Sequence, residues 1–445
     1  MTPRNMDRYI YILRSYFQFE TIERRNFNMN YNKKEIDTFE LPFLKWSIIG
    51  SSIGIIIGVV IALFLLCLES ATKFRNNNPY ILFLLPIGGV LVSFLYYKYG
   101  SNSSKGNNLI IEKINEGCED IPLRMTPLVF FGTVVTHLLG GSAGREGTGV
   151  QIGASIGENI GKLLKLNKYE NRIVIMAGVS GGFSAIFGTP LAGTIFGLEV
   201  SVIGKMSYEA LIPCLAASIL GNSVVSFLGI KHSHYIIKEI PNLSIISAFK
   251  IVLASIVFGL ISRLFSKLTH KLKYIFSKLF KNIFIKSFIG GIFVIVLTLI
   301  IGDYKYLGLS LPLMENAFKG HVHPMDFLGK LVFTSVTLGS GYQGGEVTPL
   351  FVIGSTLGSS LSALLNLSPS FLASLGLISV FTGATNTPIA SFILGIEMFG
   401  SKGAIYMLIA CSISYTFSGH TGIYTSQSIG IKKSTFTFLK NILNG

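Results

Sequence analysis

The sequence predicts an all-α membrane protein that crosses the bilayer several times. Its 445 residues are 50% hydrophobic and only 13% charged, whereas a soluble domain carries about 25% charged residues. The first long apolar run, 46–68, contains no charged residue and is long enough for a span, which takes about 20 residues. Five further apolar runs follow it: 79–97, 208–229, 246–262, 287–302 and 403–417.

The polar start of the chain differs from a secretory signal. Residues 1–42 carry charges of both signs and have no short basic start followed by a cleavage site. We therefore expect a cytoplasmic N-terminal tail.

The net charge of +15 is best explained by membrane topology. Residues 263–286 contain Lys and Arg but no acid, and cytoplasmic loops of membrane proteins are enriched in basic residues. We expect a cytoplasmic loop here, with an amphipathic helix against anionic lipid, and no nucleic-acid partner. The scattered cysteines form no CxxC pair, so we expect no disulfide framework, metal site or cofactor.

Several apolar segments are short and interrupted by Gly or Pro. Irregular backbone at membrane depth is tolerated only where it is buried in protein or lines a cavity. Such segments at matching places in two halves mark the binding site of a transporter. They cover 174–188, 190–203, 347–366, 371–382 and 388–400.

Two motifs recur in the same order about 200 residues later. The stretch TPLA at 189–192 returns as TPIA at 387–390, and GREGT at 144–148 is echoed by GGEVT at 344–348. We infer two homologous halves. The expected organisation is a tail (1–42), a first half (43–230), a connector with the basic loop (231–286) and a second half (287–445), to which a helix at about 246–262 also belongs. No C-terminal regulatory domain is expected.

Glu146 is the first candidate functional residue. A carboxylate at the centre of a bilayer costs at least ~2.5–3.5 kcal/mol and marks a functional site by default. Burial disfavours its charged form, so it can exchange a proton near neutral pH. The glycines around it leave N–H groups free, and the helix that begins near Thr148 offers its N-terminus to a carboxylate or an anion. Competition between the two is the physical basis of proton–anion exchange. The alternative is a carboxylate that only caps the helix and pairs with Arg145.

The other candidates each allow a structural alternative. Glu346 and Thr348 hold the equivalent place in the second half, where Glu346 is a second proton acceptor, a selectivity residue or a helix cap. Asn107 and Asn108 are helix caps or amide donors to an anion. For Glu199 and Glu397 we favour an architectural role, in which each carboxylate accepts hydrogen bonds from loop N–H groups. Tyr424 is an interfacial tyrosine or a donor to an anion.

One enzyme motif is present, but its signal is weak. Residues 178–181 (GVSG) match the serine motif of intramembrane proteases, with His137 and His420 as available bases. A four-residue match in a chain with 48 glycines carries little weight.

Taken together, the motifs resemble the CLC family of anion channels and proton-coupled anion transporters. The resemblance is carried by GREGT at 144–148, TPLF at 348–351 and SGHTGIYTSQ at 418–427. It implies a homodimer whose protomers each have their own pathway, built from two inverted halves of tilted, partial helices. It also implies that Glu146 is the gating and proton-carrying glutamate. The implied anion-binding residues are Asn107 (or Asn108 if the register slips), Gly144, Gly147, Glu346, Val347, Thr348 and Tyr424.

Departures from the common family motifs resemble the bacterial fluoride–proton antiporter branch. Thr148 replaces a proline, Asn107 replaces a serine, and Glu346 and Thr348 change the second-half motif. Val200 stands where chloride–proton exchangers carry a second proton glutamate. Fluoride holds its water tightly, so its site must replace that shell with hydrogen-bond donors.

We therefore expect a secondary active transporter rather than an enzyme, exporting fluoride in exchange for protons across a bacterial plasma membrane. Its partners are fluoride, protons, the lipid bilayer and a second copy of the chain. The alternatives are a chloride/proton exchanger or a passive anion channel and, more distantly, an intramembrane serine hydrolase on Ser180.

Overall fold

The computed structural model describes residues 40–117, 119–232 and 235–433. The chain divides into two units, Met1–Leu44 and Lys45–Gly445, and the architecture that follows is that of the second. The expected tail over 1–42 lies outside the described residues, apart from the start of the first helix at Glu40.

The elements of the first half are nearly all helical. In chain order they are α2 (Glu40–Asn77), the 3-10 helix η3 (Pro79–Leu84), α3 (Leu85–Tyr99), η4 (Ser101–Lys105), α4 (Asn107–Glu116), α5 (Met125–Leu138), α6 (Glu146–Leu163), α7 (Lys168–Phe187), α8 (Pro190–Glu199), β1 (Val202–Ile203), η5 (Tyr208–Ala210) and α9 (Leu211–Phe227).

The second half repeats this order. Its elements are α10 (Ile245–Leu279), α11 (Ile283–Ile301), α12 (Leu311–Lys319), α13 (Asp326–Gly339), α14 (Val347–Leu365), α15 (Pro369–Thr385), α16 (Pro388–Phe399), η6 (Ser401–Gly403), α17 (Ala404–Phe417) and β2 (Ser428–Ile429). The strands β1 and β2 pair in parallel and join the two halves.

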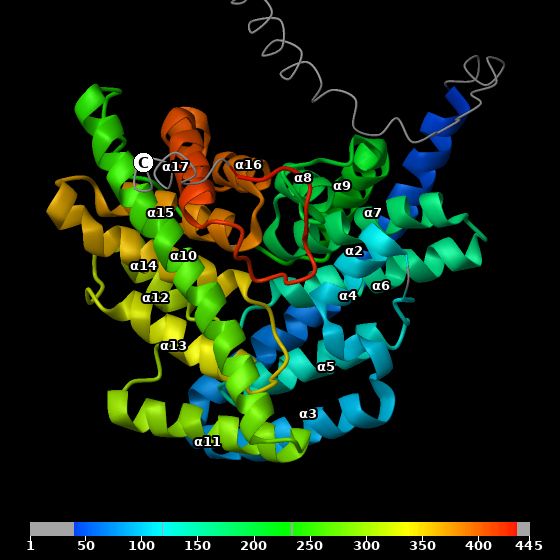
Figure 1. Ribbon diagram of the computed structural model, residues 1–445, viewed down its shortest axis with the longest axis horizontal. Helices are drawn as coiled ribbons and strands as arrows, with labels where there is room; N and C mark the ends of the chain where they lie inside the picture. The colour runs from blue at the N-terminus through cyan, green and yellow to red at the C-terminus, as the bar shows by residue number, and fades with distance from the viewer. Residues whose placement is uncertain (1–39, 118, 233–234, 434–445) are drawn as a thin grey trace, which may run out of the picture. The chain divides into compact units, whose positions relative to one another are not determined.

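Counterpart helices of the two halves lie on opposite sides of a common axis. In Figure 1 the first half lies on the right and the second on the left, with α3 beside α11 at one end and α8 near α16 at the other. The pairing of α6 with α7 recurs as α14 with α15. The duplication inferred from the repeated motifs is therefore confirmed.

The register of the repeat corrects one expectation. Helix α6 begins at Glu146, and its counterpart α14 begins at Val347. Glu346 is the residue before α14, as Arg145 is the residue before α6. The structural counterpart of Glu146 is thus Val347, and Glu346 corresponds to Arg145. The sequence echo placed Glu346 opposite Glu146, one residue out of register.

Among the described residues, six helices are long and apolar enough to cross a membrane, which makes this a multi-span membrane protein. They are Pro42–Asn77, Pro79–Tyr99, Tyr208–Phe227, Ile245–Leu279, Ile283–Ile301 and Val347–Leu365. Shorter apolar helices accompany them. Pro369–Thr385 and Pro388–Phe399 fall where interrupted segments were predicted, and Met125–Leu138 is a further one.

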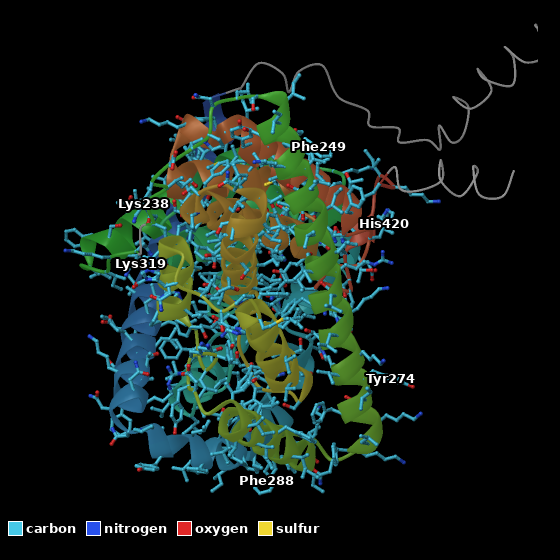
Figure 2. The ribbon with its side chains drawn as sticks, turned by 90° about the vertical axis from the view of Figure 1, so that its left-hand side faces the viewer. Lys238, Phe249, Tyr274, Phe288, Lys319 and His420 are labelled. Atoms are coloured by element: carbon cyan, nitrogen blue, oxygen red, sulfur yellow. The ribbon has the colours of Figure 1, made fainter. Side chains whose placement is uncertain are left out.

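Helix α10 is longer than expected. The predicted helix at 246–262 continues without a break to Leu279, so most of the basic stretch 263–286 belongs to this helix instead of a loop with a separate amphipathic helix. Figure 2 shows α10 running along one side of the molecule, from Phe249 near its start to Tyr274 near its end. Both side chains are exposed. The basic residues of 263–279 thereby lie on a helix that borders the cavity described below, whereas Lys286 lies on α11.

Glu199 and Glu397 join the halves by a reciprocal exchange of hydrogen bonds. The carboxylate of Glu199 accepts from the backbone N–H groups of Ile389 and Ala390 at 3.2 and 2.8 Å. The carboxylate of Glu397 accepts from those of Leu191 and Ala192 at 2.9 and 2.7 Å. Each carboxylate satisfies N–H groups that the first turn of a helix leaves without a partner. The architectural role predicted for both residues is confirmed.

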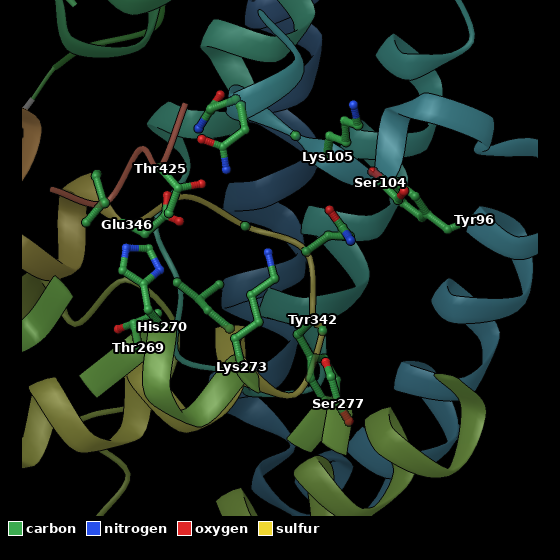
Figure 3. Close-up of a pocket in the computed structure, with 18 of the residues that line it drawn as sticks. Tyr96, Ser104, Lys105, Thr269, His270, Lys273, Ser277, Tyr342, Glu346 and Thr425 are labelled. Atoms are coloured by element: carbon green, nitrogen blue, oxygen red, sulfur yellow. The ribbon is translucent and has the colours of Figure 1, made fainter. Parts of the chain in front are cut away.

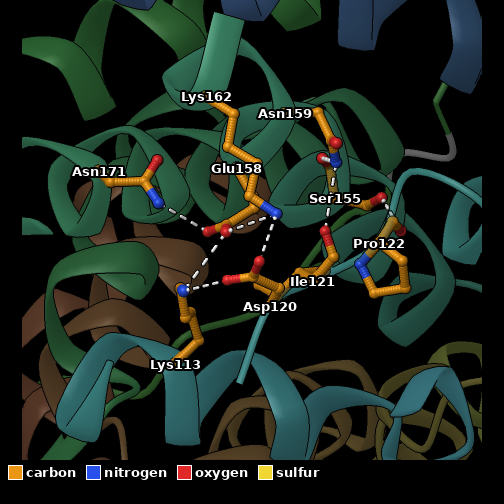
Figure 4. Close-up of polar contacts among 9 residues, drawn as sticks. All are labelled: Lys113, Asp120, Ile121, Pro122, Ser155, Glu158, Asn159, Lys162 and Asn171. Carbon is orange, nitrogen blue, oxygen red and sulfur yellow. Dashed lines mark hydrogen bonds and ion pairs between the residues drawn. The ribbon is translucent and has the colours of Figure 1, made fainter. Parts of the chain in front are cut away.

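A cluster of ionic contacts fixes α4 against α6 (Figure 4). Glu158 on α6 is completely buried and lies 3.4 Å from Lys113 on α4 and 3.3 Å from Lys162. Asn171 donates to it at 2.8 Å. Both lysines also bind Asp120 in the α4–α5 loop, at 2.8 and 3.0 Å. Their hydrogen bonds lower the pKa of Asp120 to about 2, so these contacts persist well into the acidic range.

The cluster predicts how the two lysines contribute to stability. Replacing both, as K113M/K162M, leaves the buried Glu158 with an uncompensated charge, which costs about 3–5 kcal/mol when a buried pair is broken. We expect a clear fall in the apparent melting temperature of the purified protein. Adding Glu158→Gln to the double variant removes the stranded charge and should recover part of the loss. A triple variant no more stable than the double one would show that the charge of Glu158 is not the cause.

Candidate functional site

The two loops that carry the repeated GxE motifs meet at a pair of glycines. Gly144 donates its N–H to the carbonyl of Gly345 at 2.6 Å, and Gly345 donates to that of Gly144 at 2.8 Å. A side chain would not fit between them, since a Cβ on Gly345 would lie 2.6 Å from the nitrogen of Gly147. The two glycines therefore allow helices α6 and α14 to begin side by side.

Buried polar groups hold the loop before Glu146 in place. Lys330 on α13 is fully buried, and its ammonium group donates to Ser142 Oγ at 3.0 Å and to the carbonyl of Gly308 at 2.7 Å. The N–H of Ser142 donates to Thr337 Oγ1 at 3.2 Å. His137 Nε2 lies 3.1 Å from the carbonyl oxygen of Ala143. Residues of the second half thus position the loop of the first half.

The carboxylate of Glu146 lies on the N-terminus of α14. It is 1% exposed, and its Oε2 accepts from the N–H of Thr348 at 2.9 Å. Its Oε1 accepts a short hydrogen bond from Thr348 Oγ1. Within its own loop it accepts from the N–H of Arg145 at 3.1 Å, and the Arg145 Nε lies 3.7 Å from Oε1. The carboxylate therefore uses donors that a bound anion would need.

A cavity of about 650 Å³ adjoins these residues (Figure 3). Glu346, Asn107, Asn108 and Tyr424 all line it. The remaining lining includes basic side chains from three elements, with Lys273 on α10 pointing into the space between Lys105 and Glu346. Besides Lys273, the basic side chains in the lining are Lys105, His270 and Lys286. The cavity combines the charge and the donor groups that attract anions.

The two asparagines at the start of α4 have different surroundings. Asn108 Oδ1 accepts from the N–H of Ser426 at 3.1 Å, so this side chain anchors the segment that carries Tyr424. The Nδ2 of Asn107 lies 3.1 Å from the position that a Cβ on Gly147 would occupy, and Glu346 Oε2 lies 3.8 Å from that same position. Asn107 is thus the asparagine whose amide reaches the backbone beside Glu146.

The segment that carries Tyr424 is held from several sides. His270 Nε2 lies 2.8 Å from the carbonyl oxygen of Gly422. Gln427 Nε2 donates to the carbonyls of Val200 and Thr385 at 2.7 and 2.8 Å. Tyr424 itself is 5% exposed and lies at the cavity wall. Helices α4, α8, α10 and α15 together fix its position.

A family model described as voltage gated chloride channel matches residues 88–419, which is most of the chain. The chain belongs to the CLC family. A chloride/fluoride channel protein of Pseudomonas syringae pv. tomato is 43% identical over 400 residues, 88% of each protein. An H(+)/Cl(-) exchange transporter of Vibrio cholerae is 27% identical over 339 residues, 72% of each.

Solved structures agree on the fold. A CLC-type fluoride/proton antiporter superimposes with a TM-score of 0.86 at 35% identity, over 88% of this chain and 100% of that one. A slow cyanobacterial Cl-/H+ antiporter reaches a TM-score of 0.75 at 20% identity, over 86% and 96% of the two chains. The predicted CLC fold of two inverted halves is confirmed.

One predicted role within this CLC site needs correction, and the structure also bears on the distant hydrolase alternative. The N–H of Gly144 is taken by Gly345, so it does not face an anion. Ser180 lies fully buried inside α7. Neither proposed base is near it by contact: His137 bonds Thr133 and Ala143, and His420 accepts from the N–H of Lys433. Ser180 Oγ donates instead to the carbonyl of Thr194 at 3.4 Å, so these contacts give the hydrolase alternative no support.

Sequence reasoning missed three polar residues. Lys330 is the one basic residue of α13 and is fully buried, and a lysine within that segment is a signal that the sequence did offer. Thr133 pairs with Thr148 through their hydroxyls at 2.7 Å, so Thr148 faces α5 rather than the cavity. Gln151 lines the cavity on α6, five residues after Glu146.

The glycine pair predicts a steric effect of an added side chain on the approach of the two loops. Gly345→Ala puts a methyl group against the backbone of Gly147, and overpacking of this kind costs about 1–3 kcal/mol. We expect a lower melting temperature and slower anion transport. Gly403→Ala is a matched control, because its added Cβ would meet no atom closer than 3.4 Å. Equal behaviour of the two variants would contradict the close approach of the loops.

Proposed function

We propose that this protein is a fluoride/proton antiporter that exports fluoride in exchange for protons. One observation carries the proposal: the carboxylate of Glu146 occupies the N–H and hydroxyl donors of Thr348. The proposal is supported by the likeness to a CLC-type fluoride/proton antiporter and to a chloride/fluoride channel protein.

In this mechanism, fluoride and the carboxylate take turns on one set of donors. A proton on Glu146 removes its negative charge and weakens its hold on Thr348, so that the side chain can leave and fluoride can bind. Return of the ionised carboxylate displaces fluoride. Each exchange moves a proton and an anion in opposite directions, because the two negative charges cannot occupy the donors together.

Fluoride is the anion that this donor set suits. It is small and strongly hydrated, so a site must replace its water with several short hydrogen bonds, and charge-assisted bonds of this kind are the stronger ones. In the proposal the donors are Thr348, Tyr424, Asn107 and the free N–H groups of the first turns at Gly147 and Val347. Glu346 faces the same cavity, where it donates a hydrogen bond if protonated.

The proposal also covers the cellular location of the protein and its oligomeric state. We place the protein in a bacterial plasma membrane, with its N-terminus and the basic stretch 263–286 in the cytoplasm, because basic residues accumulate there. We also propose a homodimer joined through α8, α9, α16 and α17, which lie together at the top of Figure 1. Apolar side chains on these helices are exposed: Leu191, Leu211, Ile219, Ile389, Ile405 and Leu408.

The function is tested with purified protein in liposomes. An outward fluoride gradient should drive protons inward, and Glu146→Gln, which cannot exchange a proton, should abolish proton movement. Anion flux and external pH are recorded together with a fluoride electrode and a pH electrode. Chloride carried as fast as fluoride would support a chloride transporter instead, and anion flux without proton movement would indicate a channel. Coupling that persists in Glu146→Gln would remove this residue from the mechanism.

Thr348 supplies a second prediction. Thr348→Ala removes a hydroxyl donor, and a hydrogen bond to a charged group is worth about 1.5–3 kcal/mol. We expect at least a tenfold loss of fluoride transport at limiting concentration. Thr348→Ser keeps the hydroxyl and serves as the control, with transport near that of the wild type. If the alanine variant transports as well as the serine variant, the hydroxyl does not bind fluoride.

A further inference from the structure

The segment that carries Tyr424 is closed at its two ends by one lysine. Residues 418–433, the Tyr424 loop, follow α17 and reach the first half, where β2 pairs with β1 (Figure 1, red). Lys433 lies at the far end of this loop and is 7% exposed. Its backbone N–H donates to His420 Nε2 at 3.0 Å. The start and the end of the loop therefore meet, with Tyr424 between them.

The ammonium group of Lys433 binds the C-terminal ends of two helices. It donates to the carbonyl of Tyr415 at 2.7 Å and to Ser418 Oγ at 3.1 Å, at the end of α17. It also donates to the carbonyl of Gly419 and, at 2.7 Å, to Oδ1 of Asn386, the C-cap of α15. The last carbonyls of a helix have no helical partner, and the helix dipole favours a cation there. These two helix ends explain why a basic side chain is buried at this place.

Asn386 connects Lys433 to the chain on both sides of Tyr424. While its Oδ1 accepts from the lysine, its Nδ2 donates to Gln427 Oε1 at 2.9 Å. The same Nδ2 packs on Gly422, 2.6 Å from the position that a Cβ would occupy there. Gly422 precedes the tyrosine by two residues and Gln427 follows it by three. Contacts therefore run from the ammonium group to both flanks of Tyr424.

The Tyr424 loop depends on such side-chain contacts for its shape. Apart from the two residues of β2, the loop contains no helix or strand. A group that binds a small ion has to be held within about 0.5 Å of its productive position. Contacts that limit the movement of this loop therefore bear on anion binding.

We propose that Lys433 is a positioning residue for the anion site, whose ammonium group holds the two ends of the Tyr424 loop together and thereby keeps the Tyr424 hydroxyl at the cavity. This inference rests on the proposed function, in which Tyr424 donates to fluoride. Lys433 lies outside the cavity lining, so its effect on the anion passes through Tyr424. Without the ammonium group the tyrosine can move away from the anion, while Glu146 still exchanges its proton.

The first test replaces Lys433 with methionine, which keeps the length of the side chain and removes its charge and its donors. We expect the apparent KM for fluoride in liposomes to rise about fivefold, a coupling of about 1 kcal/mol within one hydrogen-bond network, with the proton-to-fluoride ratio unchanged. The assay is run at a pH below the pKa of Lys433, which burial lowers to about 7, so that the ammonium group is charged. Lys432→Met is the matched control, because this neighbouring lysine is exposed and its loss should leave KM unchanged.

A double-mutant cycle distinguishes positioning from a loss of stability. Tyr424→Phe removes the hydroxyl that Lys433 would position, so adding Lys433→Met to it should change KM by less than about twofold. A purely structural role of Lys433 would lower the melting temperature in both backgrounds and reduce the amount of active protein, and so the maximal rate, without this dependence of KM on Tyr424. A fivefold rise in KM that persists in the Tyr424→Phe background overturns the proposal, and so does an unchanged KM in the single variant.

A second variant covers the case in which Lys433→Met does not fold. Asn386→Gly removes the contacts with Lys433 and Gln427, and glycine suits the φ of 60° at this position. It should also raise the KM for fluoride, with no further effect where residue 424 is phenylalanine. An unchanged KM in folded Asn386→Gly protein overturns the proposal.

Failure of the proposed function has a different signature. If the wild type carries chloride and not fluoride, the same variants are measured with chloride. A rise in the chloride KM of Lys433→Met that disappears in the Tyr424→Phe background then supports the positioning role even though the antiport of fluoride is wrong. A wild-type protein that transports neither anion overturns both.

Discussion

One set of hydrogen-bond donors at the start of α14 serves a carboxylate in this structure, and the same set suits an anion. Glu146 reaches these donors from the other half of the molecule. A buried charge without partners costs several kcal/mol, so in the proposed function the carboxylate and the anion compete for the few groups available. The rest of the scaffold has to keep two loops, separated by about 200 residues of chain, within hydrogen-bond distance.

The scaffold achieves this with polar contacts in an apolar interior. The glycine bridge brings the loops together, and Lys330 and Thr337 hold Ser142 from the second half. Glu199 and Glu397 tie α8 and α16 across the same axis. A membrane offers no hydrophobic force between helices, and such contacts between halves are what specify their arrangement.

The sequence predicted the long apolar helices, the duplication and a buried carboxylate at Glu146 near a helix start, because each leaves a local pattern. It predicted less well where a contact depends on register between distant segments. Asn107 and Asn108 are adjacent and chemically alike, and only the hydrogen bond from Ser426 assigns Asn108 to anchoring. The N–H of Gly144 looked available, but its partner Gly345 lies in the other half. Helix α10 continues through most of the basic stretch 263–286, because basic residues spaced among apolar ones suit a helix at the edge of a cavity as well as they suit a loop.

The shift of one residue between the two loops explains how a duplicated chain forms a site with unequal halves. In perfect symmetry two glutamates would each cap the helix of the other half, and neither would be free to respond to an anion alone. Glu146 is instead the first residue of α6 and reaches α14, whereas Val347 holds the corresponding place in α14 and offers α6 no carboxylate. Glu346 takes the position of Arg145 and lies at the cavity. The two carboxylates therefore have different surroundings, and in the proposed function this difference lets Glu146 exchange with the anion while Glu346 stays at the cavity wall.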